Sequence, residues 1–324
     1  MRSVQTETRF PLSSVKPLEA LHVYREYCLA ETQKVTGTGT SRRTVSPITG
    51  SVLKPFGKVG SFEYLVCPDT GSLFLAELPS PETWAALLKR IHQHRRSPGG
   101  FHAQLAASRS DNVYQPKVEW IRETLALQGI HRPALLEAGI FPSDLSALLM
   151  QSGVFSRVEC ADQMDLAHGD LSRKSSLEGG FQVAVLLESL DRSDGPEKLL
   201  EAVQRCLSRG GLLFATALVA SGFDLQTLGT QNRYLYPPDR ANCLTLHGLQ
   251  RLLERLKFDL VEVSTPGVLD VEIVQAHLDQ DPSLPISRFE RSLVLSDEPT
   301  RQAFQSFLQQ RGLSSYARVV ARKP

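Results

Sequence analysis

The feature that most constrains the fold is a pair of continuous apolar runs separated by one amphipathic segment. The runs cover residues 182–189 (QVAVLLES) and 211–219 (GLLFATALV), which is the pattern of strands buried on both faces of a parallel sheet. Residues 196–209 repeat apolar side chains at helical spacing, and we expect this helix to end at Gly210 and Gly211. The sequence therefore predicts a strand–helix–strand unit with parallel strands.

Similar elements lie on both sides of this unit. Residues 133–139 (PALLEAG) and 157–162 (RVECAD) are strand candidates, with a helix predicted between them over residues 142–151. After Thr245, a candidate N-cap, leucines at helical spacing predict a helix, and residues 259–265 (DLVEVST) predict another strand. Because strands and helices alternate, we predict an α/β fold with a doubly wound, Rossmann-like sheet.

Composition divides the chain into three parts. Residues 1–80 are rich in Thr, Ser, Gly and Pro and contain short strand-like pieces such as residues 62–66, so we expect a small β-rich module there. Residues 81–129 contain two amphipathic patterns that predict connecting helices. Residues 130–324 hold the alternating elements and form the predicted Rossmann-like domain.

Charge and hydropathy exclude several classes of protein. Lys and Arg number 36 against 35 Asp and Glu, so the net charge of +1 gives no field for a polyanion, and we expect no nucleic-acid partner. The apolar runs are much shorter than the roughly 20 residues of a membrane span. Five widely spaced cysteines and a polar start without a signal-peptide core predict a cytoplasmic protein with reduced thiols.

The loop after the first predicted strand of the sheet carries the residues that suggest a function. Doubly wound sheets bind ligands outside the carboxyl ends of their strands, and this loop begins at Glu137 and Gly139. Here the chain resembles class I S-adenosylmethionine-dependent methyltransferases, whose first strand ends in an acidic-x-Gly-x-Gly-x-Gly turn. Glu137 and Gly139 match, whereas Phe141 and Ser143 stand at the later glycines. The resemblance implies S-adenosylmethionine as cofactor, bound over Glu137, Gly139 and Phe141.

The order of the following segments extends the resemblance over about residues 116–324. Asp162 ends the second predicted strand, where the family places an acid on the cofactor ribose. Residues 181–218 resemble the family's fourth strand, helix and fifth strand. The resemblance implies that Glu188, at the end of that fourth strand, and Leu190 line the methionine or adenine side of the cofactor.

Residues 232–258 look like the family segment that follows the fifth strand, which in bacterial members commonly reads Pro-Pro-acidic-His. The resemblance implies an acceptor that is a small molecule, a sugar or a glycan precursor. The residues implied to face this acceptor are Tyr234, Arg240 and Asn242.

Candidate catalytic bases come from the same stretch: Asp239, His247 and Tyr236. Each also has a structural interpretation. Asp239 follows two prolines, as a turn residue commonly does. His247 lies in the first turn of a predicted helix, where solvated and capping roles are common. A missing base would not prevent methyl transfer, because positioning of the reactants supplies much of the acceleration.

The N-terminal part contains two copies of the frame x-Pro-x-x-Gly, beginning at Ser46 and Cys67. They resemble the two Cys-Pro-x-Cys-Gly knuckles of a zinc ribbon. Tetrahedral zinc needs four Cys or His ligands, and of the four knuckle positions only Cys67 is a cysteine, since the others are Ser46, Thr49 and Thr70. We therefore expect a degenerate zinc-ribbon-like module that holds no metal.

Two functional hypotheses remain open. The first is a methyltransferase that binds S-adenosylmethionine over residues 137–143. The second is a non-catalytic relative that binds a protein partner or stabilises an assembly, because two glycines, three zinc ligands and two histidines, at Arg240 and Tyr316, are replaced in one chain. Phe141 discriminates between them: a side chain directed into the cleft would fill the cofactor space.

Overall fold

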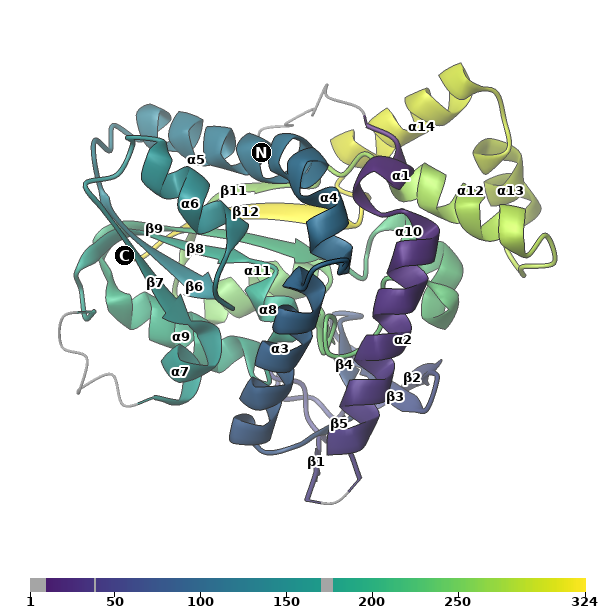
Figure 1. Cartoon of the computed structure of the whole chain (residues 1–324), viewed down its shortest axis with the longest axis horizontal. Coiled ribbons are helices and arrows are strands. Elements are labelled where there is room, and N and C mark those ends of the chain that lie inside the picture. The colour runs from purple at the N-terminus through teal and green to yellow at the C-terminus, as the bar shows by residue number, and fades with distance from the viewer. Residues whose placement is uncertain (1–9, 38, 170–176) are drawn as a thin grey trace.

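The computed structural model describes residues 10–37, 39–169 and 177–324. Its centre is a six-stranded sheet with the order β11-β12-β9-β8-β6-β7 (Figure 1). Strands β7, β6, β8 and β9 run parallel, whereas β12 is antiparallel to both of its neighbours. The strands are β6 (Ala134–Gly139), β7 (Arg157–Asp162), β8 (Phe181–Leu187), β9 (Leu207–Leu218), β11 (Asp259–Ser264) and β12 (Tyr316–Arg322). The predicted α/β fold with a mostly parallel sheet is confirmed.

Helices cover both faces of this sheet, so the apolar runs of β8 and β9 are buried almost throughout. One face packs against α5 (Gln115–Leu127) and α6 (Asp144–Gln151). The other packs against α7 (Gln163–His168), α9 (Pro196–Cys206) and α11 (Leu246–Arg255). Thr245 is the N-cap of α11, as predicted.

Two predicted helix boundaries in this region are wrong. Helix α9 ends at Cys206 instead of reaching Arg209, because Leu207 already pairs with Phe181 in the sheet. Helix α6 begins after Ser143, its N-cap, so Pro142 precedes the helix.

Residues 10–78 combine a long helix with short strands. Sequence analysis predicted the strand β3 (Phe62–Val66) but not α2 (Leu18–Val35), whose Thr- and Ser-rich surroundings hid a buried stripe that includes Leu21, Tyr24 and Cys28. The other elements here are α1 (Leu12–Val15), β1 (Ser41–Arg42), β2 (Lys54–Val59), β4 (Leu73–Leu75) and β5 (Glu77–Leu78). The expected β-rich character therefore applies only to the residues after α2.

A second, four-stranded sheet ties these strands to the C-terminal half of the chain. Its order is β10-β4-β3-β2, and β10 (Asn242–Cys243) pairs with β4 through the register Cys243↔Leu73. The segment that follows β9 is thereby held against the N-terminal strands. This contact positions residues 234–240 at the site described below.

The remaining helices surround the ends of the strands. They are α3 (Pro81–Arg96), α4 (Phe101–Arg109), a π-helical turn (Ser110–Tyr114), α8 (Ser189–Arg192), α10 (Phe223–Leu228), a 3-10 turn (Gly229–Gln231), α12 (Asp270–Gln280), α13 (Arg288–Val294) and α14 (Glu298–Gln310). Figure 1 shows α2 and α3 side by side, and the two helices pack together. Within the described ranges, no helix has the length and hydropathy needed to cross a bilayer.

Candidate active site

The strand order of the main sheet defines a switch point between β6 and β8. From β6 the chain passes through α6 to β7 on one side, and from β7 it passes through α7 to β8 on the other. Such a reversal leaves a crevice outside the carboxyl ends of the two strands, where open α/β sheets bind ligands. A crevice is present there, which we call the switch-point crevice. Its floor is lined by Ala138, Gly139, Ile140, Leu187 and Ser189.

Glu137 is buried beneath this crevice and has a structural task. Its two carboxylate oxygens accept hydrogen bonds from Ser143 Oγ and Ser146 Oγ, each at 2.7 Å. Burial raises the pKa of Glu137, although these two hydroxyls lower it in part. Ser143, which occupies a position of the family's glycines, thus joins the end of β6 to the start of α6.

Gly139 leaves the crevice open at the end of β6. A Cβ atom built there would meet only Ser189 Oγ, at 3.8 Å, and Ser189 itself donates a hydrogen bond to Ala138 O at 2.8 Å. Ile140 contributes to the lining of the crevice, whereas Phe141 does not. The aromatic ring at this degenerate glycine position therefore does not occupy the crevice.

Asp162 lies beside Gly139 at the end of the neighbouring strand, β7. Its Oδ1 accepts from the backbone N–H groups of Met164 at 2.9 Å and Asp165 at 3.3 Å, which caps α7. Its Oδ2 lies 3.8 Å from Lys89 Nζ of α3. The residue is in the region implied for the ribose, but its side chain is not part of the crevice lining.

The basic end of α3 covers the crevice. His92 Nε2 lies 2.8 Å from Pro142 O, Arg96 pairs with Asp144 at 2.5 Å, and Arg95 lines the crevice between them. A run of basic residues at a helix end is ordinarily solvated, but here it faces the loop that follows β6. Only the tertiary packing of α3 reveals this.

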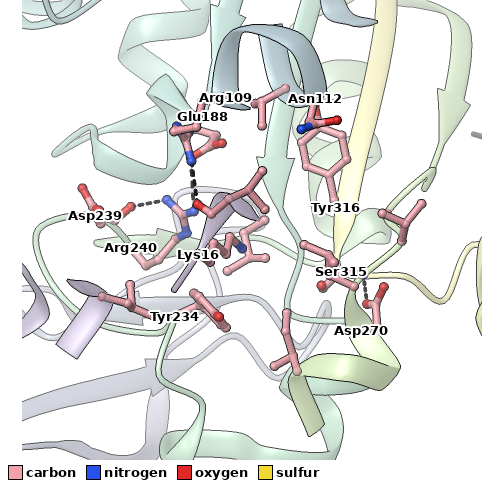
Figure 2. A pocket seen from close by; sticks show the side chains of 18 of the residues that line it. Lys16, Arg109, Asn112, Glu188, Tyr234, Asp239, Arg240, Asp270, Ser315 and Tyr316 are labelled. Carbon is pink, nitrogen blue, oxygen red and sulfur yellow. Dashed lines mark hydrogen bonds and ion pairs between the residues drawn. The ribbon is translucent and has the colours of Figure 1, made fainter. Parts of the chain in front are cut away.

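A second and larger cavity adjoins the crevice; we call it the large pocket (Figure 2). Its volume is about 180 Å³. Its walls come from α1, α2, α4, α5, α12, β12 and the segment after β9. Four residues line both cavities: Tyr24, Arg95, Arg192 and Asp239.

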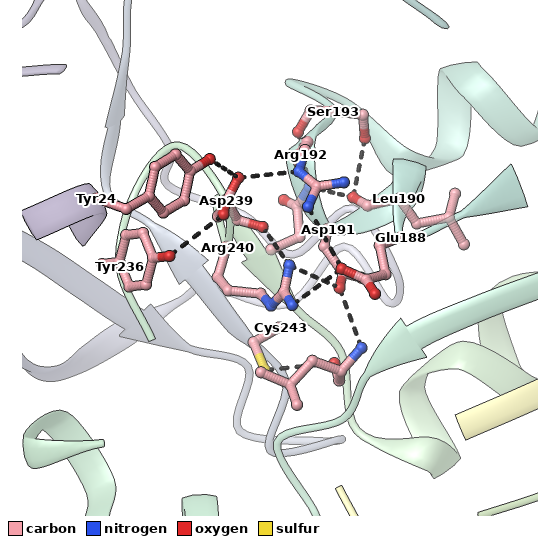
Figure 3. A network of polar contacts seen from close by, with 12 residues as sticks. Tyr24, Glu188, Leu190, Asp191, Arg192, Ser193, Tyr236, Asp239, Arg240 and Cys243 are labelled. Atoms are coloured by element: carbon pink, nitrogen blue, oxygen red, sulfur yellow. Dashed lines mark hydrogen bonds and ion pairs between the residues drawn. The ribbon is translucent and has the colours of Figure 1, made fainter. Parts of the chain in front are cut away.

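A buried network of charged groups forms one wall of the large pocket (Figure 3). Glu188 follows β8 in the left-handed region at φ +56°, a costly conformation for a residue other than glycine, and pairs with Arg192 at 3.3 Å and Arg240 at 3.2 Å. Burial would raise the pKa of Glu188, but Arg240 and Arg192 outweigh burial and hold it well below its usual range. The two guanidinium groups thus keep Glu188 ionised.

Asp191 belongs to the same network, but its pKa is shifted in the opposite direction. Its Oδ2 lies 3.5 Å from Arg240 Nη1 and accepts from Leu218 N at 3.0 Å. Burial raises the pKa of Asp191 to about 7, despite the partly compensating charge of Arg240. The protein therefore holds two nearby carboxyl groups with different affinities for a proton.

Two of the three candidate bases, Asp239 and Tyr236, lie together at this wall. Asp239 pairs with Arg192 at 3.0 Å and accepts from Tyr236 OH at 3.3 Å. Burial would raise the pKa of Asp239, but Arg192, Arg95 and Arg240 lower it to about 2, whereas burial and Asp239 raise the pKa of Tyr236 well above its usual value. Asp239 is thus a permanent anion and a weak base near neutral pH.

Tyr234 and Arg240, both implied to face the acceptor, line the large pocket as well. Lys16 Nζ lies 4.0 Å from the centroid of the Tyr234 ring. Burial and then Arg240 lower the pKa of Lys16 to about 8. Sequence analysis missed Lys16, because a single lysine ahead of an unpredicted helix carries no pattern.

Besides Phe141 and Asp162, three more residues singled out from the sequence line neither cavity. The Leu190 side chain is fully buried in the core beneath the sheet. Asn242 is also fully buried, and its side chain bonds to Leu190 O, Ser193 O and Arg43. His247 is exposed in the first turn of α11, as its structural interpretation expected.

The four knuckle positions of the N-terminal part converge on one point. Cys67 Sγ lies 3.6 Å from Thr49 Oγ1, and the hydroxyls of Ser46 and Thr70 also bond to this sulfur. Ser51 Oγ lies at 3.6 Å too. Burial would raise the pKa of Cys67, but the four hydroxyls lower it to about 7.

Comparison with known proteins adds one sequence match. Residues 147–263 match the family model described as a methyltransferase domain, and no curated protein matches the chain. The match begins within α6 and ends within β11. It therefore includes β7, β8, β9 and the segment that follows β9.

Similar solved structures are distant. They include the 1,6-didemethyltoxoflavin-N1-methyltransferase of Burkholderia thailandensis, with 14% identity, a TM-score of 0.42 and coverage of 83% of this chain and 99% of that chain. The plantazolicin methyltransferase BamL has 10% identity, a TM-score of 0.40 and coverage of 75% and 97%. The cyclase SpnF has 15% identity, a TM-score of 0.37 and coverage of 63% and 80%. At these values the structural likenesses carry no argument about ligand or reaction, and the family match is confined to residues 147–263.

Proposed function

We propose that the chain is an S-adenosylmethionine-dependent methyltransferase that binds its cofactor in the switch-point crevice and a small-molecule acceptor in the large pocket. The observation that carries the proposal is the wall shared by the two cavities, formed by Tyr24, Arg95, Arg192 and Asp239. Ligands in adjoining cavities can meet at this boundary. The match of residues 147–263 to a methyltransferase domain supports the same reading.

The reaction needs positioning more than it needs a protein base. A lone pair of the acceptor attacks the methyl carbon in line with the sulfonium, a bond to that carbon forms, and the carbon–sulfur bond breaks. The sulfur keeps the electron pair and leaves as the neutral thioether of S-adenosylhomocysteine, while the acceptor gains the positive charge or releases a proton. Two oriented sites can supply much of the acceleration for such a step.

The residues of the crevice suit a cofactor of this kind in two respects. Gly139 leaves space where backbone must approach a ligand, and Phe141 stays out of that space. We assign Glu137 the task of holding the loop, since both of its oxygens are already bonded. The residues implied for the ribose and the methionine end lie beside the crevice and do not line it: Asp162 caps α7, and Glu188 lines the large pocket.

Calorimetric titration with S-adenosylmethionine and S-adenosylhomocysteine tests the proposal. We expect micromolar binding, and a thermal shift that corresponds to about 2.7 kcal/mol at roughly 100 times the dissociation constant. Gly139→Val should abolish binding while leaving the fold intact, because Gly139 has no positive φ and its Cβ would meet no backbone. Gly139→Ala is the matched control with a smaller effect. No heat and no shift at millimolar ligand would refute the proposal and favour the non-catalytic alternative.

A further inference from the structure

The large pocket is cationic, although the whole chain is nearly neutral. Seven basic side chains line it against three carboxylates. The basic residues are Lys16, Arg95, Arg109, Lys117, Arg192, Arg240 and Arg318, and the acidic ones are Glu188, Asp239 and Asp270. The excess of positive charge belongs to the pocket and not to the whole chain, so its effect depends on which of these side chains are neutralised by neighbours.

All three carboxylates already have bonding partners within the protein. Glu188 and Asp239 pair with Arg192 and Arg240 in the buried network. Asp270 accepts from Ser314 Oγ at 2.5 Å, from Ser315 N at 2.6 Å and from the side chain of Gln305. The acidic groups therefore pair directly with Arg192 and Arg240, whereas Lys117 and Arg109 lower the pKa of Glu188 only from a greater distance.

Three of the other cations are buried, and within the described part of the chain none forms an ion pair. Arg109 is 8% exposed, Lys117 4% and Arg318 6%. Their neighbours are aromatic rings: Arg109 and Lys117 lie 5.7 and 5.8 Å from the Tyr114 ring, and Lys117 and Arg318 lie 5.5 and 6.0 Å from the Tyr316 ring. Rings hold cations in place but do not neutralise them.

Several donors at this wall are also unsatisfied. Arg109 Nε, Arg318 Nε and the Tyr316 hydroxyl are buried without a hydrogen-bond partner among the described residues. Among the described residues, the Arg109 side chain has one hydrogen-bond partner, Val15 O, which lies at 3.4 Å from Nη1. Buried donors without partners are rare in native proteins, and a bound ligand that accepts hydrogen bonds would account for them.

We propose that Arg109, Lys117 and Arg318 form a subsite for an anionic group of the acceptor, a carboxylate or a phosphate, with the Tyr316 hydroxyl as a further donor. The inference rests on the proposed function, because it names the substrate class of the same pocket. Neighbouring desolvated cations repel one another, and an anion between them removes that repulsion. Guanidinium groups add paired donors that match both carboxylate and phosphate oxygens.

The subsite joins two parts of the sequence that are about 200 positions apart. Arg109 ends α4, Lys117 lies in the first turn of α5, and Arg318 lies on β12. Asn112, which stands near Arg109 in Figure 2, lines the same side of the pocket. An acceptor bound here would extend from the wall shared with the crevice toward β12.

The test uses inorganic phosphate and acetate as probes on the full-length protein, against sodium chloride at equal ionic strength. We expect one or both anions to raise the melting temperature of the wild type beyond the chloride control. In Lys117→Met and Arg318→Met the affinity for that anion should fall about tenfold or more, as expected for lost bonds to a charged group. Lys198→Met removes an exposed lysine and is the matched control, which should keep the wild-type affinity.

A second readout separates a ligand site from a structural role. Without added anion, Lys117→Met and Arg318→Met should unfold at the same temperature as the wild type or higher, since each removes a buried charge that has no ion-pair partner among the described residues. A phosphate response without an acetate response indicates a phosphorylated acceptor, and the reverse indicates a carboxylate. Equal responses in wild type and both variants, or no response to either anion, would overturn the inference.

Titration of the same variants with S-adenosylhomocysteine distinguishes the two proposals. Lys117→Met should bind S-adenosylhomocysteine as the wild type does, because Lys117 does not line the crevice. Binding of S-adenosylhomocysteine without any anion response would overturn the subsite alone. An anion response without S-adenosylhomocysteine binding would overturn the methyltransferase and leave an anion-binding pocket.

Discussion

Arg192 Nε lies 3.0 Å from Asp239 Oδ1, and this buried ion pair stands in the wall between the switch-point crevice and the large pocket. Arg192 also holds Glu188 at 3.3 Å, while Tyr24 and Tyr236 donate to Asp239. The pair joins α8, at the end of β8, to the segment after β9. It therefore sets the relative position of the two proposed binding sites.

Removal of Arg192 should destabilise the protein strongly. Arg192→Gln leaves Asp239 and Glu188 buried with less compensation, and we expect a loss of about 3 kcal/mol in the free energy of unfolding, measured with urea. Asp239→Asn should cost less, because Arg192 keeps Glu188 as a partner. A loss below about 1 kcal/mol for Arg192→Gln, the range of exposed pairs, would contradict a buried pair.

Anion binding in the large pocket should depend on pH through Lys16. The pKa of Lys16 is about 8 in the free protein, and an anion favours its protonated form. Affinity for sulfate, which does not titrate in this range, should thus be highest below pH 8 and fall as the pH rises past it. Isothermal titration at pH 7 and pH 9 measures the change.

The other charged groups around Lys16 are Tyr234, Arg240, Glu188, Asp224 and Arg109. The pKa of Asp224 is about 6, that of Glu188 lies well below its usual range and that of Tyr234 is raised, so these three keep their charge between pH 7 and 9. Asp191, beside Arg240, has a pKa of about 7 and loses its remaining proton in this range, which also weakens anion binding. Lys16→Gln should therefore reduce the difference between pH 7 and pH 9; an unchanged dependence in this variant would show that Lys16 is not responsible.

The side chain of Ser143 should contribute more to the free energy of unfolding than that of an ordinary helix cap. Ser143→Ala removes the cap of α6, worth about 1 kcal/mol, and also leaves one oxygen of buried Glu137 without its donor. Ser287→Ala is the matched control, because Ser287 caps α13 at the surface. Urea unfolding should give the larger loss for Ser143→Ala, and equal losses would mean that the bond to Glu137 contributes nothing.

The hydroxyl cluster at Cys67 should accept zinc once cysteines are restored. Ser46, Thr49 and Thr70 all contact the Cys67 sulfur, so the triple variant Ser46→Cys, Thr49→Cys, Thr70→Cys places four thiols at one point. We expect the purified variant to retain zinc, measured by metal analysis, and the wild type to retain none. A metal-free triple variant would argue against descent of this module from a zinc ribbon.

Local patterns were sufficient to predict most of the sheet. The apolar runs in β8 and β9 and the leucine stripe of α11 are strong signals, because burial on both faces or along one stripe demands them at short range. The position of Glu137 and Gly139 at a strand end followed from the same patterns. Helix α2 was missed, since its few buried apolar residues lie between polar ones.

Most of the candidate site depended on contacts that no local pattern records. Lys16, Arg109, Lys117 and Arg318 are each an ordinary basic residue in the sequence, and three of them become buried neighbours around two tyrosine rings only after α4, α5 and β12 pack together. Likewise, Leu190 and Asn242 are close in sequence to pocket residues but point into the core or bond to backbone.

The sequence by itself determined the alternation of buried strands and amphipathic helices, and with it the α/β sheet and the loop after β6 where a ligand would bind. Only the tertiary structure decided that Phe141 stays outside the crevice, that Asp239 is held as a weak base by Arg192, and that a nearly neutral chain has a cationic pocket. The physical reason is the distance along the chain over which each effect acts. Hydrophobic periodicity acts between residues a few positions apart, whereas the charge, pKa and accessibility of a side chain depend on neighbours that folding brings from anywhere in the chain.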